Sequence, residues 1–203
     1  KPKIPKPKNI KKSKDEEIAI AVLSDIQLAK VTPDYNTEVA EERVIKYANK
    51  IVDLANIQRQ VHTVNKCAVF AAGDIIEGEL IFPGQSHLID SSLYKQVTVD
   101  GPRIMTKFFD ILLANFDEVD VHWVIGNHGH LGGRARKDYH PDSNADRMLG
   151  RIMSMIYRDE KRIKWTIPDS TGDNHWFDIA DLGPKSRFFI WHGDNVRGFN
   201  GFP

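Results

Sequence analysis

The chain has 203 residues, and its 28 Lys and Arg are balanced by 28 Asp and Glu. The length is sufficient for one domain with a buried core, and zero net charge removes any whole-protein electrostatic argument for nucleic-acid binding. The sequence has no apolar run of about 18 residues and no apolar leader, so we expect no membrane partner. The single cysteine, Cys67, is interpreted as a small core residue, and we expect a cytoplasmic location.

The first 14 residues contain three prolines and many lysines but no acidic residue. We interpret residues 1–17 as a basic tail, disordered or extended. An arm that contacts polyanions is the alternative. Residues 18–203 are predicted to form one domain.

Four continuous apolar runs of strand length predict buried strands; in chain order they cover 18–23, 67–72, 119–125 and 187–191. Two weaker runs predict strands at 162–167 and 176–179. Helical spacing of apolar residues predicts three helices, at 38–61 with Thr37 as N-cap, at 103–116 and at 145–157. Alternation of these strands and helices predicts an α/β fold.

Residues 77–102 include four residues that break regular structure, namely Pro83, Gly84, Gly101 and Pro102. We expect an irregular excursion here with some helix near its end. The segment is a candidate lid or a surface through which the chain forms oligomers.

Each of the four continuous runs is followed closely by a side chain that can bind a metal, in order Asp25, Asp74, Asn127 and His192. In open α/β architectures, ligands lie at the carboxyl ends of strands. Four such ends can therefore meet at one crevice, where the rigid strands hold the side chains in place.

Two of the four motifs offer carboxylates. Asp25 and Gln27 are two residues apart, so on an extended strand end they point the same way. Gly73 lets the backbone turn sharply before Asp74; Glu77 and Glu79 are competing ligands, but Asp74 is favoured because it ends the strand. An ordinary turn that begins with Asp explains either motif taken alone.

The other two motifs offer an amide oxygen and an imidazole. Asn127 follows Gly126, and the adjacent His128 can act as an acid or bind phosphate. His192 follows the run at 187–191. A histidine at the edge of the core is the alternative for His192 alone.

The ordered series D-x-Q, G-D, G-N-H and H-G, each after an apolar strand, resembles the calcineurin-like metallophosphoesterases. The resemblance spans about residues 18–194 and implies a four-layer α-β-β-α sandwich. It further implies that Asp25 and Gln27 bind one divalent cation, that Asp74 bridges two, and that Asn127 and His192 bind the second. His128 is then the catalytic histidine.

The sequence departs from the family pattern in three places. Gln27 stands where the family has His, which weakens that site for transition metals or favours Mn²⁺. Gly129 stands where the family has Asp or Glu after G-N-H, so the group that orients His128 must come from elsewhere. The closing G-H-x-H motif is missing, and we expect the fold to be incomplete at its C-terminus, with the last metal-binding segment beyond Pro203.

The resemblance implies two divalent cations, with Mn²⁺ as first choice and Fe, Zn or Mg as alternatives. His130, Arg134 and Arg136, in the polar loop after Asn127, are candidate residues for binding the substrate. The expected function is a phosphodiesterase or nuclease that acts on DNA. A small-molecule or nucleotide phosphoesterase and an inactive binding or scaffold protein are the alternatives.

Overall fold

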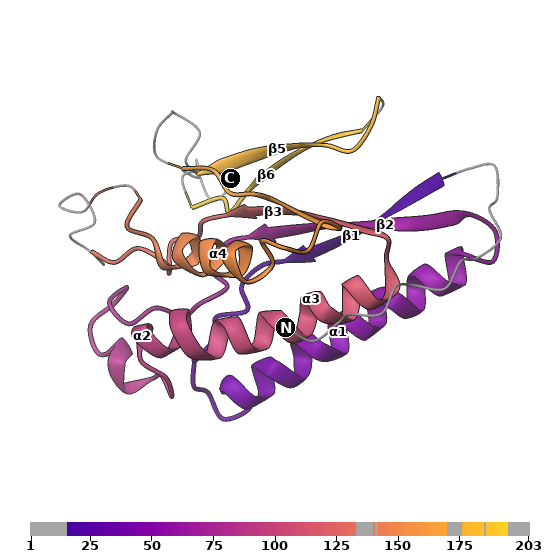
Figure 1. The fold of residues 1–203 in the computed structure, drawn as a ribbon. Coiled ribbons are helices and arrows are strands. Elements are labelled where there is room, and N and C mark those ends of the chain that lie inside the picture. Colours follow the sequence, from indigo (N-terminus) through magenta and orange to yellow (C-terminus); the bar gives the residue numbers. More distant parts are fainter. Residues whose placement is uncertain (1–15, 133–139, 141, 170–175, 185, 195–203) are drawn as a thin grey trace, which may run out of the picture.

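The computed structural model describes residues 16–132, 140, 142–169, 176–184 and 186–194. Within these ranges the protein is a mixed α/β fold, with helices on one side of a parallel sheet and a two-stranded sheet on the other (Figure 1). No described helix combines the length and apolar character needed to cross a bilayer.

The main sheet has four parallel strands in the order β1-β2-β3-β4. Their bounds are β1 Glu16–Leu23, β2 Thr63–Ala72, β3 Glu118–Val124 and β4 Ile163–Thr166. The strands predicted from the apolar runs are present, and β1 and β2 begin before their runs. Because all four strands are parallel, the ends of β1, β2 and β3 lie at one edge of the sheet.

The helices α1 Thr37–Gln58, α3 Gly101–Asn115 and α4 Ala145–Ile156 bury one face of the sheet. In α1 the buried side chains recur at helical spacing, from Ala40 through Val44 and Ala48 to Ile51. The N-cap of α1 is Asn36, whose side chain accepts a hydrogen bond from the Val39 amide, so the prediction of Thr37 was wrong by one residue.

The predicted irregular excursion between β2 and α3 contains only short turns of helix: η1 Gln85–His87, α2 Leu93–Lys95 and η2 Gln96–Asp100. Two fully buried amide side chains replace the missing regular hydrogen bonds. Gln96 accepts from the Gly78 amide at 2.9 Å and donates to the Ser91 carbonyl at 2.8 Å. Gln85 donates to the Glu77 carbonyl at 2.9 Å. The excursion is thus an ordered part of the core.

The strands β5 Phe177–Asp181 and β6 Arg187–Trp191 form an antiparallel pair on the other face of the main sheet. Ala180 and Ile190 pack there against Phe70 and Val124. The described residues therefore form three layers. The prediction of a buried strand at 187–191 holds for one face only: β6 alternates, and Phe189 is 48% exposed while Ile190 is 5% exposed. The predicted buried strand at 18–23 also alternates, since Val22 on β1 is 53% exposed.

A buried ion pair joins the two sheets. His122 on β3 lies with its Nδ1 atom 2.6 Å from Asp178 on β5 and its Nε2 atom 3.6 Å from Asp120. Burial alone would lower the pKa of His122, but the two carboxylates outweigh it and raise the pKa to about 9. The unfolded value is about 6.5, so this pair stabilises the fold fully below that pH and is lost as the pH rises through about 9.

We therefore expect this pair to contribute a fall of about 2 kcal/mol in the free energy of unfolding between pH 6 and pH 9.5, after allowing for solvent around Asp120. Asp178→Asn should lower stability at pH 6 and flatten this fall, whereas Asp181→Asn, on the exposed side of β5, should keep it. Urea unfolding at the two pH values measures the effect. An equal fall in the free energy of unfolding between the two pH values in wild type and Asp178→Asn would contradict the assignment of this fall to the His122–Asp178 pair.

Candidate metal centre

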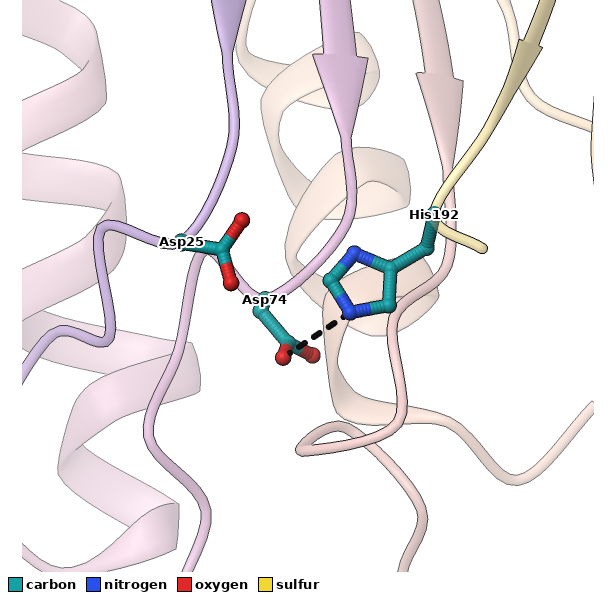
Figure 2. Close-up of side chains that lie close together, drawn as sticks. All are labelled: Asp25, Asp74 and His192. Atoms are coloured by element: carbon teal, nitrogen blue, oxygen red, sulfur yellow. Dashed lines mark ion pairs between the residues drawn. The ribbon is translucent and has the colours of Figure 1, made fainter. Parts of the chain in front are cut away.

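Three of the predicted ligands lie together at the carboxyl ends of their strands. Asp25, Asp74 and His192 follow β1, β2 and β6, and each offers one ligand atom within 4.8 Å of the other two. Figure 2 shows the two carboxylates and the imidazole ring directed toward a common space. Strands from both sheets therefore contribute to one cluster.

The backbone is turned sharply at both aspartates. Asp25 has φ 53° and Asp74 has φ 52°, in the left-handed region that few residues other than Gly, Asn and Asp adopt. Gly73 is also left-handed, and a Cβ atom there would lie 2.7 Å from the Gly126 backbone. The turns after β2 and β3 therefore approach so closely that only glycine fits, which places Asp74 in the centre of the cluster.

His192 presents its Nε2 atom to the cluster. Its Nδ1 atom lies 2.9 Å from the Ala72 carbonyl and donates to it, which fixes the orientation of the ring. Nε2 then lies 3.1 Å from Asp74 Oδ2 and 3.1 Å from Asn127 Oδ1. The hydrogen bond to Asp74 raises the pKa of His192 to about 9. Asn127 thus joins the cluster through its side-chain oxygen.

His128 lies beside Asp74 and is held by Glu77. The His128 amide donates to Asp74 Oδ1 at 2.8 Å, and its Nδ1 atom lies 2.8 Å from the Glu77 carbonyl and 3.3 Å from the Glu77 carboxylate. The hydrogen bond to Glu77 raises the pKa of His128 to about 8. Because position 129 is glycine, the group that orients His128 has to come from another residue, and Glu77, only 2% exposed, supplies it. The spacing of Glu77 from Asp74 in the sequence did not reveal this contact.

Gln27 is placed differently from the other candidates. Its backbone amide donates to the Asp74 carbonyl at 2.9 Å, so the residue lies next to the cluster. Its side-chain oxygen, however, accepts a hydrogen bond from Lys30 Nζ at 2.5 Å. In this conformation Lys30 occupies the oxygen that was predicted as a metal ligand.

The predicted substrate-binding residues are only partly described. His130 lies in the turn after Asn127, and its backbone donates to the Asn127 carbonyl at 3.4 Å. Arg134 and Arg136 lie outside the described residues, so their predicted role stays a prediction.

Asp146, near the start of α4, is a residue that the sequence did not single out. Its carboxylate is fully buried and accepts backbone hydrogen bonds from Asp74 at 2.9 Å and from Ile75 at 3.1 Å, after β2, and from Gly126 at 3.0 Å, after β3. Burial, and then the charge of Asp74, raise the pKa of Asp146 to about 6. In sequence, Asp146 reads as an ordinary acidic residue in the first turn of a helix.

The same region explains Gly129. Asn144, the N-cap of α4, donates to the Gly126 carbonyl at 3.0 Å, and a Cβ atom at Gly129 would collide with its side-chain oxygen. A carboxylate residue at position 129 would displace Asn144. The departure from the expected G-N-H-D or G-N-H-E pattern is therefore a packing requirement of this chain.

The donor set fits a divalent cation. Two carboxylates, an amide oxygen and an imidazole nitrogen suit Mn²⁺, Fe²⁺ or Zn²⁺. The hydrogen bond from His192 to Ala72 is the type of support that orients metal-binding histidines. Asp25, Asp74, Asn127 and His192 are thus the described residues that can hold a metal here.

We expect Asp146→Asn to lower the free energy of unfolding by about 3 kcal/mol, because the new amide group faces backbone donors that need an acceptor. Asp53→Asn, on the exposed face of α1, is the matched control and should change stability by less than about 0.5 kcal/mol. Urea unfolding at pH 7.5 compares them. An equal free energy of unfolding in Asp146→Asn and wild type would contradict the bridging role of Asp146.

No family model matches the chain, and no curated protein matches it at a significant level.

Proposed function

We propose that this protein is a metal-dependent hydrolase of phosphoric esters, with the chemistry of the calcineurin-like metallophosphoesterases. The observation that carries the proposal is the meeting of Asp25, Asp74 and His192 at three strand ends. Asn127 and His128 lie in contact with this cluster. Carboxylate, imidazole and amide donors around one carboxylate are the arrangement that holds metal ions next to a phosphoryl group.

The donors divide into two sets around Asp74. Asp25 lies on one side of Asp74, while Asn127 and His192 lie together on the other side. Asp74 would therefore be shared, with Asp25 completing one set and the amide and imidazole completing the other. When bound, two divalent cations at such a site polarise the phosphoryl group and lower the pKa of an attacking water.

The protein supplies positioning and proton transfer. His128 has its Nδ1 atom engaged by Glu77, and its Nε2 atom lies 3.9 Å from Asp74 Oδ2. The ring can therefore offer a proton at Nε2 to the leaving oxygen or bind a phosphoryl oxygen. Asp146 holds the turns that carry Asp74 and Asn127, so the donors keep their spacing.

DNA is the substrate that we propose first, cleaved as a phosphodiester. A small-molecule or nucleotide ester is the second candidate, and one observation favours it: a cavity of about 520 Å³ adjoins Asp25 and Gln27. This volume suits one drug-sized group. Loss of activity with retention of the fold is the remaining alternative, and the engagement of Gln27 by Lys30 is its support.

We also propose that the fold is a four-layer α-β-β-α sandwich. The outer face of the β5–β6 pair carries Ile179, Phe189 and Trp191, which are 51%, 48% and 40% exposed. Aromatic rings pack against one another across this face. An apolar sheet face of this kind supports a further covering layer.

Calorimetric titration with Mn²⁺ tests the metal centre. We expect Asp74→Asn to weaken binding at least 100-fold, because Asp74 is the shared donor. His192→Ala should weaken binding about tenfold to 100-fold, since it removes one ligand of one set. His62→Ala, before β2 and away from the cluster, is the control and should bind as wild type does. Equal affinity in Asp74→Asn and wild type would reject the centre.

A second prediction separates catalysis from metal binding. His128→Ala should lower kcat for bis-(p-nitrophenyl) phosphate by about 10²- to 10⁴-fold, the range for loss of a general acid. Its Mn²⁺ affinity should stay within about threefold of wild type. Steady-state kinetics on this ester and on single- and double-stranded DNA, beside calorimetry, measure both quantities. Loss of Mn²⁺ binding in His128→Ala would show that His128 is a ligand instead.

A further inference from the structure

A cavity of about 520 Å³ lies beside the cluster of metal-binding side chains. It lies between the end of β1 and the N-terminal half of α1, under the loop that joins them. Its lining includes Asp25 and Gln27, so it opens directly next to the metal-binding side chains. Asp74 and His192 do not line it. The cavity therefore extends from the Asp25 side of the cluster.

The cavity has two aromatic walls and an apolar floor. Tyr35 donates from its hydroxyl to the Ile26 carbonyl, and Tyr47 accepts at its hydroxyl from the Val22 amide at 3.0 Å. Both rings are thus fixed by their polar ends, and both residues line the cavity. One face of the Tyr47 ring stacks on Phe108, so that only part of its surface is directed to the cavity. Leu23, Ala40 and Val44 supply the floor.

Two cations also line the cavity. The Arg43 guanidinium lies 5.1 Å from the centroid of the Tyr35 ring. Lys30 is hydrogen-bonded to Gln27. Two carboxylates, Asp25 and Asp34, line the cavity as well, so its cations are balanced in number. The Tyr35 ring and the Arg43 guanidinium offer flat surfaces on which a planar group can stack.

We propose that this cavity binds the nucleoside part of a nucleotide ester whose phosphate lies at the Asp25–Asp74–His192 cluster. The inference rests on the proposed function and names its substrate class. One base with its sugar fills a concave space of this size, whereas a double helix does not enter it. A free mononucleotide and the terminal nucleotide of a single strand share this chemistry.

Binding of thymidine 5′-monophosphate, measured by calorimetry in EDTA and again with Mn²⁺, tests the cavity without catalysis. We expect wild type to bind the nucleotide at least tenfold more tightly than inorganic phosphate in both conditions. Thr32→Trp places a large ring at the exposed rim of the cavity and should weaken nucleotide binding about tenfold or more, while Mn²⁺ affinity is unchanged. Arg43→Gln should weaken nucleotide binding about fivefold. Lys46→Gln, exposed on the same helix but outside the lining, is its control.

The outcomes for the cavity and for the proposed function can be told apart. Equal nucleotide affinity in wild type and Thr32→Trp overturns the cavity, even if the protein hydrolyses esters. Cavity-dependent nucleotide binding by a protein that binds no Mn²⁺ supports the cavity and rejects the metal-dependent function. A 5′-phosphorylated thymidine pentanucleotide that binds at least tenfold more tightly than the mononucleotide identifies the end of a single-stranded DNA as the ligand. Tighter binding of the mononucleotide identifies a free nucleotide.

Discussion

The buried carboxylate of Asp146 holds the turns after β2 and β3 against each other, and the geometry of the cluster depends on this contact. Its oxygens accept from Asp74, Ile75 and Gly126, whose amides no strand or helix would otherwise satisfy at this depth. The contact fixes Asp74, which in turn accepts from His128 and lies beside His192. A helix start far along the chain thus sets the positions of two strand ends.

The parallel sheet could be predicted because its strands are continuous apolar runs with helices between them. The exposure of β6 could not, since a run such as 187–191 is apolar on both faces whether or not both are covered within the described residues. The buried ion pair of His122 and Asp178 was also hidden, because it joins strands of two sheets that share no sequence signal. Tertiary contacts of this kind follow from packing and not from local pattern.

The candidate site, like the parallel sheet, could be predicted in part from the positions of the apolar runs. Asp25, Asp74 and Asn127 each follow a strand of the parallel sheet, so their convergence at one edge follows from parallel pairing. His192 follows β6 of the antiparallel pair and joins them through the packing of the two sheets. The residues that orient the site could not be predicted. Glu77 contacts His128 from an irregular segment, and Asp146 has the appearance of an ordinary acidic residue in the first turn of a helix. The side chain of Gln27 also depends on Lys30, a contact that no spacing rule gives. The candidate ligands could be predicted because they follow strand ends, whereas the residues that orient them depend on tertiary contacts.

Soaking crystals of the protein in MnCl₂ and collecting anomalous diffraction data near the manganese absorption edge would locate the cations that this cluster binds. We expect anomalous peaks at coordination distance from the Asp74 carboxylate, with Asp25 on one side and His192 Nε2 with Asn127 Oδ1 on the other. Peaks elsewhere, or no peak beside a fully ordered Asp74 at saturating Mn²⁺, would contradict this expectation.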